Sequence, residues 1–177
     1  MRLRSLLFVP GDSERKFARA RDCGADALIL DLEDSVAAAE KSAARARVAG
    51  LIDPEAKRAW TFIVRVNALD TGLTLDDLAA VVKPGLDALL IPKVNGAADL
   101  ERIGCYLDAL EAKAGMASGL VGLAIVATET PKAMFALGSY APAHPRLIAL
   151  TLGRGGPLGG ARRDRQQGAR RVLDISL

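Results

Sequence analysis

The sequence predicts an α/β fold built on parallel β-strands, and three observations support this prediction. Six short apolar runs, bounded by turn residues, alternate with segments of helical length along residues 1–151. The phrases Gly-Ala-Asp-Ala-Leu-Ile-Leu (24–30) and Gly-Leu-Asp-Ala-Leu-Leu-Ile-Pro (85–92) indicate equivalent positions in two βα units. Polar or charged residues follow five of the six runs. A TIM-type (β/α) barrel delivers its functional side chains in this way, at the carboxyl ends of its strands.

The predicted elements follow one another in alternation. Each strand is a short apolar run, and each helix is an amphipathic segment that would pack on the sheet. We expect the strands at residues 6–9, 27–30, 61–66, 88–91, 120–127 and 147–151. We expect the helices at residues 13–22, 36–49, 75–82, 98–114 and 131–137.

The residues just after the strands are the candidate functional residues. They include Asp31, Glu33 and Asp34 after the second strand, Arg65 at the end of the third, Lys93 after the fourth and Glu129 after the fifth. Because these strand ends meet at one rim, we expect the acids, Arg65 and Lys93 to converge there. In the alternative interpretation, Asp34 or Ser35 caps the next helix and the other acids are solvated.

Glu129 and Arg65 are the most specific of these candidates. Glu129 follows a nearly wholly apolar strand and precedes Thr130-Pro131, a helix cap with proline at the first helical position. Mg²⁺ is typically held by one or two carboxylates together with substrate oxygens, which a glutamate at the inner rim would allow. The planar guanidinium of Arg65 suits a substrate carboxylate.

A second candidate site lies at the first predicted helix. Arg15 and Lys16 fall in its first turn, which Ser13 is expected to cap, and cations there oppose the helix dipole by about 0.3–1 kcal/mol each. A bound phosphate would use both side chains and the free N–H groups; the alternative is two solvated charges. His144, the only histidine, lies between prolines in a loop at the opposite rim and is interpreted as structural.

Charge and composition limit the function classes. Residues 152–177 carry six arginines and two aspartates, a net of +4, which leaves 18 basic and 19 acidic groups, a net of −1, in residues 1–151. The body of the chain is therefore not basic, and we expect no nucleic-acid partner. Apolar runs are too short to cross a bilayer, and two distant cysteines indicate a reduced, cytoplasmic protein without membrane association.

Five segments resemble the citrate lyase β-subunit / malyl-CoA lyase family of aldolase-type lyases. They are RSLLFVPGDSERKFARA, GADALILDLEDSV, VRVNALDTG, DALLIPKV and ATETPKAMFAL, in order between Arg4 and Leu137. The resemblance implies a TIM barrel and a Mg²⁺-dependent lyase that cleaves malyl-, citramalyl- or citryl-like thioesters of coenzyme A into a 2-oxo acid and an acyl thioester. It implies a homo-oligomer whose partners are these small molecules.

The resemblance also implies roles for the candidate residues. Glu129 would be a Mg²⁺ ligand and part of the substrate site, and Arg65 would bind the oxo-acid carboxylate. Asp31, Glu33 and Asp34 would support that catalytic site. The region of Arg15 and Lys16 would lie near the phosphates of coenzyme A, and Lys93 would also contact the cofactor.

The resemblance ends after Thr151. Family members continue with a Trp-Gly-Ala-Glu-Asp-Leu segment, whose aspartate is a second Mg²⁺ ligand, and with two further βα units. Here residues 152–160 read Leu-Gly-Arg-Gly-Gly-Pro-Leu-Gly-Gly. Permitted codons for this stretch encode the family segment when the frame shifts by one base. We therefore expect an incomplete barrel of about six βα units (residues 1–151) and an irregular, out-of-frame tail (residues 152–177). The alternative function is a non-catalytic remnant, or a subunit that acts only in an oligomer or with a complementing C-terminal piece.

Overall fold

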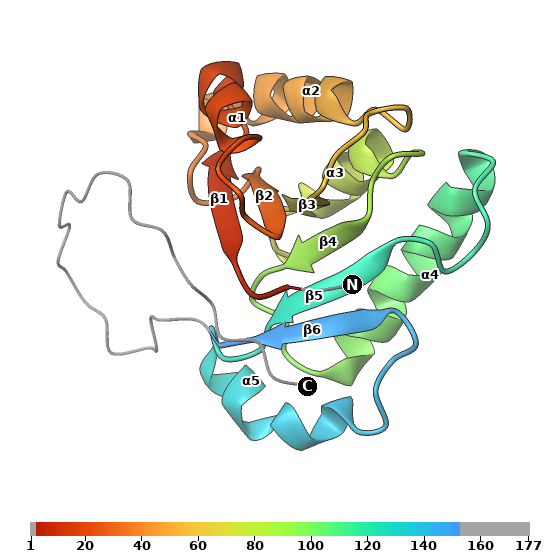
Figure 1. Cartoon of the computed structure of the whole chain (residues 1–177). Helices are drawn as coiled ribbons and strands as arrows, with labels where there is room; N and C mark the ends of the chain where they lie inside the picture. Colours follow the sequence, from red (N-terminus) through yellow and green to blue (C-terminus); the bar gives the residue numbers. More distant parts are fainter. Residues whose placement is uncertain (1–2, 153–177) are drawn as a thin grey trace, which may run out of the picture.

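The computed structural model describes residues 3–152, and it confirms the predicted α/β class. Six parallel strands form one sheet in the order β1-β2-β3-β4-β5-β6. The strands are β1 (Leu6–Pro10), β2 (Ala27–Asp31), β3 (Thr61–Arg65), β4 (Ala88–Ile91), β5 (Gly122–Val126) and β6 (Leu147–Thr151). The sheet is curved, as in a barrel, but it is not closed: within residues 3–152, β1 pairs only with β2 and β6 only with β5 (Figure 1).

Helices connect the strands. The longer ones are α1 (Glu14–Ala20), α2 (Lys41–Leu51), α3 (Thr74–Val81), α4 (Ala97–Lys113) and α5 (Pro131–Phe135). Short 3₁₀ turns, η1 (Ala38–Glu40) and η2 (Leu137–Tyr140), precede α2 and follow α5. As predicted, Ser13 caps α1 through the Lys16 amide, and Thr130 caps α5, which has proline in its first turn.

Alternation along the strands divides the core into two apolar clusters. Leu28, Leu30 and their equivalents on the other strands pack against the helices. The intervening residues, which include Ala27, Ile29 and Ile63, face the other side of the sheet and form a smaller cluster. This side corresponds to the interior of a barrel. The helices therefore cover one face only, and residues that continue the inner positions past the strand ends reach the interior rim.

The predicted helix at residues 36–49 begins too early, because α2 starts at Lys41. The preceding residues are held in turns: the Ser35 amide donates to Asp31 Oδ2 at 3.0 Å, and the Val36 amide donates to the Glu33 carbonyl. Residue Glu40 stands at the cap position of α2 and makes no side-chain cap bond, so the expectation that Asp34 or Ser35 caps this helix is wrong. No helix within residues 3–152 has the length and apolar character needed to cross a membrane.

Candidate active site at the carboxyl ends of the strands

Asp31 and Arg65 form the centre of the site because strand register places them side by side. They are Cα partners in the β2–β3 pairing, and both continue the inner face of the sheet. Arg65 Nε donates to Asp31 Oδ1 and Arg65 Nη2 to Asp31 Oδ2, each at 2.7 Å. This two-pronged geometry is the strong form of an arginine–carboxylate pair. Asp31 also accepts the Glu33 amide at 2.8 Å, so its carboxylate orders the loop that follows β2.

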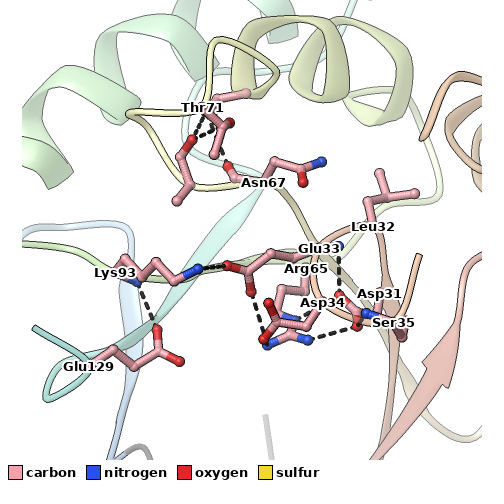
Figure 2. A network of polar contacts seen from close by, with 12 residues as sticks. Asp31, Leu32, Glu33, Asp34, Ser35, Arg65, Asn67, Thr71, Lys93 and Glu129 are labelled. Carbon is pink, nitrogen blue, oxygen red and sulfur yellow. Dashed lines mark hydrogen bonds and ion pairs between the residues drawn. The ribbon is translucent and has the colours of Figure 1, made fainter. Parts of the chain in front are cut away.

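Glu33 and Asp34 contact the same guanidinium from the β2–α2 loop. Glu33 is 5% exposed, and its Oε2 lies 3.0 Å from Arg65 Nη1. That contact lacks hydrogen-bond geometry, so Oε2 has no hydrogen-bond donor within the described part of the chain. The contact is therefore an ion pair. Asp34 is exposed, and its Oδ2 lies 3.6 Å from Arg65 Nη1. Arg65 is thus surrounded by three carboxylates (Figure 2).

Lys93 links this cluster to Glu129. Its Nζ donates to Glu33 Oε1 at 2.7 Å, and its backbone amide donates to Glu129 Oε2 at 2.8 Å (Figure 2). The two contacts require an unusual backbone: Lys93 has φ of 53°, the left-handed region that residues with a Cβ rarely adopt. Strained backbone held by its surroundings is common at functional sites.

Burial and the neighbouring charges shift the protonation equilibria of these groups. Burial alone would raise the pKa of Asp31, but the hydrogen bonds and charge of Arg65 lower it below its ordinary value. Burial raises the pKa of Glu33 in spite of Lys93 and Arg65. The hydrogen bond to Glu33 raises the pKa of Lys93. Asp31 is therefore a permanent anion at neutral pH, and Lys93 is a permanent cation.

The structure also contains a second layer of polar residues, which was not predicted from the sequence. Lys41 Nζ donates to the carbonyls of Leu32 and Glu33 and to Asn67 Oδ1. The Asn67 side chain in turn donates to Asp77, which accepts from Arg45. One signal was available in the sequence: Asp77 lies on the stripe of α3 that is otherwise formed by Thr74, Leu78 and Val81, and helical spacing alone could have indicated an acid that faces the core.

The structure places the other predicted residues away from this cluster. Arg15 and Lys16 are exposed on α1, and no contact among residues 3–152 joins their side chains to the acids. Their predicted role toward phosphates is untested. His144 lies in the loop before β6, at the opposite end of the sheet, where its Nδ1 accepts the Arg146 amide at 3.1 Å. That position agrees with a structural role.

Glu129 is suited to be one ligand of Mg²⁺, but the described residues do not complete a site. Its Oε2 is used by the Lys93 amide, and no contact within residues 3–152 uses Oε1. Three or more His, Cys, Asp or Glu side chains positioned to hold a metal ion together are not found in this part of the chain. Since Mg²⁺ accepts one or two protein carboxylates and completes its shell with water and substrate, Glu129 fits as a single anchor.

Sequence comparisons relate the chain to lyases and a thioesterase. Residues 4–155 match the family model described as HpcH/HpaI aldolase/citrate lyase. The chain is 39% identical over 150 residues to citrate lyase subunit beta of Escherichia coli K12, covering 85% of this chain and 49% of the relative. A (3S)-malyl-CoA thioesterase of Cereibacter sphaeroides is also 39% identical over 150 residues, with 85% and 48% covered. The chain thus spans about half the length of these relatives.

Solved structures agree with this relationship. The protein CitE of Mycobacterium tuberculosis, in complex with magnesium and acetoacetate, superposes with a TM-score of 0.67 at 31% identity, covering 97% of this chain and 65% of that one. Malate synthase of Haloferax volcanii gives a TM-score of 0.74 at 18% identity, covering 85% and 51%, and supports the TIM-barrel-type fold alone. The matched residues and the shared βα architecture establish that the chain belongs to the HpcH/HpaI aldolase/citrate lyase family.

Proposed function

We propose that this chain carries the substrate-binding half of a carbon–carbon lyase that acts on a 3-hydroxyacyl thioester of coenzyme A. The observation that supports this most directly is the guanidinium of Arg65, fixed by Asp31 and Glu33 at the rim of the sheet and 12% exposed. An arginine has five N–H donors. The hydrogen bonds to Asp31 occupy two of them, and Glu33 lies 3.0 Å from Nη1 as an ion pair. The N–H groups that Asp31 does not use would bind the carboxylate of a 2-oxo acid such as glyoxylate, pyruvate or oxaloacetate.

The proposed reaction is a retro-aldol cleavage. The 3-hydroxyl loses its proton, the C2–C3 bond breaks, and C3 becomes the carbonyl of the 2-oxo acid. The electron pair of the broken bond stays on C2 as the enolate of the acyl thioester, which then takes up a proton. Arg65 would orient the oxo-acid carboxylate, and Lys93 would add a second positive charge at this rim, beside Glu33. The proton donor is not assigned to any described residue.

Mg²⁺ would supply Lewis-acid polarisation of the oxo-acid carbonyl when it is bound. Glu129 is the residue of this chain proposed to hold it, and the magnesium in the related Mycobacterium tuberculosis structure supports this proposal. Because residues 3–152 offer Glu129 as the one proposed carboxylate ligand, we expect weak Mg²⁺ affinity and little or no cleavage by the 177-residue chain alone. The proposed location is the cytoplasm, and the proposed assembly is a homo-oligomer.

The test measures release of glyoxylate or pyruvate from malyl-CoA or citramalyl-CoA with Mg²⁺. The chain would be assayed alone and together with a C-terminal piece encoded by the shifted frame after the Thr151 codon. We expect cleavage to appear only in the mixture and to be lost in Arg65→Met. Arg58→Met is the matched control, because Arg58 also forms a half-buried ion pair, with Asp87 at 2.8 Å, but at the opposite end of the sheet.

The second candidate is a non-catalytic subunit or remnant, favoured because residues 3–152 hold no group of three or more His, Cys, Asp or Glu side chains that could bind a metal ion together. A mixture that folds, binds Mg²⁺ and still cleaves neither thioester would support this alternative and reject the lyase. We propose that residues 152–177 are an out-of-frame tail. A DNA read across the Leu152 codon that lacks a shifted frame for Trp-Gly-Ala-Glu-Asp-Leu would contradict that origin.

A further inference from the structure

We propose that Lys41 is a positioning residue, whose ammonium fixes the backbone of the acid loop, residues 31–35, and thereby aims Glu33 at Arg65 and Lys93. The effect of this positioning on ligand binding rests on the function proposed above. Lys41 is the first residue of α2, so it lies beyond the loop in sequence and reaches back over it. It contacts the backbone of the loop and not the carboxylates that face a ligand.

The three donors of the Lys41 ammonium match three acceptors. Nζ lies 2.6 Å from the Leu32 carbonyl, 2.5 Å from the Glu33 carbonyl and 2.8 Å from Asn67 Oδ1. An ammonium has three N–H donors, so this set satisfies the group completely. A charged donor shared by the carbonyls of Leu32 and Glu33 restrains the two peptide units that flank the Glu33 Cα, because such bonds are stronger than neutral ones.

The third acceptor is itself held in place. Asn67 Nδ2 donates to Asp77 Oδ2 at 2.7 Å, which fixes the amide so that Oδ1 faces Lys41. The Asn67 backbone amide donates to the same oxygen at 2.8 Å, and Arg45 Nε donates to Asp77 Oδ1 at 2.8 Å. Arg45 lies one helical turn after Lys41, on the same face of α2. The network therefore joins α2, the end of β3 and α3 behind the acid loop.

The acid loop is thus restrained through both its backbone N–H groups and its backbone carbonyls. Asp31 accepts the amides of Glu33 and Ser35, while Lys41 donates to the carbonyls of Leu32 and Glu33. Glu33 has a restrained amide and a restrained carbonyl, which leaves its side chain aimed at Lys93 and Arg65. Small displacements of a positioning group lower activity steeply, by about 10²-fold for 1 Å.

The experiment compares Lys41→Met with Lys83→Met in the full 177-residue chain. Lys83 is a matched control because its Nζ also donates to a backbone carbonyl, that of Ala49 at 3.1 Å, near the other end of α2. The first measurement is amide hydrogen exchange of Glu33, Ser35 and Val36 without metal or ligand. The second is the affinity for glyoxylate in the presence of Mg²⁺.

We expect exchange of these three amides to rise at least about tenfold in Lys41→Met, relative to the β2 amides of the same sample, and to stay unchanged in Lys83→Met. A merely structural role for Lys41 would raise exchange in the loop and in β2 alike, which would overturn the proposal. Unchanged exchange in the loop would overturn it as well. If Lys41→Met does not fold, Lys41→Gln retains one amide group as a donor to the loop and is expected to give a smaller rise.

The two measurements separate the two proposals. If the wild-type chain binds glyoxylate, we expect about 10–100-fold weaker binding in Lys41→Met, and equal binding would overturn the positioning role. If the wild-type chain binds no glyoxylate, the proposal that this chain carries the substrate-binding half fails. The exchange data then decide by themselves whether Lys41 positions the loop.

Discussion

Asp31 is 2% exposed, and its carboxylate is bound by Arg65 and by two backbone amides. In Asp31→Asn the guanidinium of Arg65 would lose its two-pronged partner in a buried setting. We expect the free energy of unfolding at neutral pH to fall by about 3–5 kcal/mol. Urea unfolding measures this change. Asp26→Asn is a suitable comparison, because Asp26 accepts two backbone amides but pairs with an exposed arginine, Arg4.

The same pair predicts a pH dependence. Because Arg65 lowers the pKa of Asp31 in the folded state, the ionised carboxylate stabilises the fold. This contribution is present above the pKa of the unfolded state and is lost as the pH falls through the lower, folded-state pKa. The stability difference between wild type and Asp31→Asn should therefore shrink in acid, and a difference that stays constant would contradict the assignment.

The backbone of Lys93 allows a test that separates strain from charge. Lys93→Ala and Lys93→Gly both remove the ammonium, but only glycine adopts φ of 53° without a penalty. We expect the glycine variant to be more stable than the alanine variant by about 1–2 kcal/mol in urea unfolding. Ala109, an exposed site within α4, is the control. There we expect the reverse order, with Ala109→Gly less stable than the wild type by about 1 kcal/mol. Equal stability of the two Lys93 variants would show that the backbone at residue 93 is not strained.

Among the secondary-structure elements, a second buried ion pair, Arg146–Glu111, connects α4 to the segments just before β5 and β6. Arg146 Nη1 donates to Glu111 Oε1 at 2.9 Å and to the Val121 carbonyl at 3.1 Å, while Nη2 lies 2.6 Å from Glu111 Oε2. Glu111 also accepts the amides of Gly119 and Val121. This arrangement explains how the irregular segment 114–121 is held at the end opposite the candidate site.

We therefore expect Arg146→Met to lower the free energy of unfolding by about 3–5 kcal/mol, because it leaves the Glu111 carboxylate buried without its cation. Arg102→Met is the control: Arg102 lies on the same helix as Glu111 and its Nε donates to Tyr106 on the surface. Its change should stay within about 0.5 kcal/mol. Similar losses of unfolding free energy in both variants, measured by thermal or urea unfolding, would show that the buried pair stabilises the fold no more than the surface contact does.

At the scale of the whole molecule, the open sheet predicts self-association. Within residues 3–152, β1 and β6 each have one strand neighbour, and unpaired strand edges are sites of association. Phe135 adds a side chain that is 93% exposed on α5. We expect the molar mass from light scattering to rise with protein concentration. A single monomer mass over a wide concentration range would contradict this expectation.

The α/β class, the order of the elements and the strand-end positions of the candidate residues could all be predicted from the amino-acid sequence. These follow from short-range patterns: apolar runs of strand length, helical spacing and the Thr130-Pro131 cap are all local. The start of α2 was predicted too early, because the hydrogen bonds of Asp31 and Glu33 hold the preceding loop in turns. Asp34 and Ser35 resemble a helix cap in sequence, and only these contacts show otherwise.

Which of the strand-end residues contact one another could not be predicted without the folded structure. Strand register pairs Asp31 with Arg65, and the left-handed backbone of Lys93 brings its amide to Glu129. Lys41 reads as an ordinary solvated helix residue, yet it lies behind the acid loop with three acceptors. Contacts of this kind join residues far apart in sequence, and they depend on register and on helix placement, which no local pattern encodes.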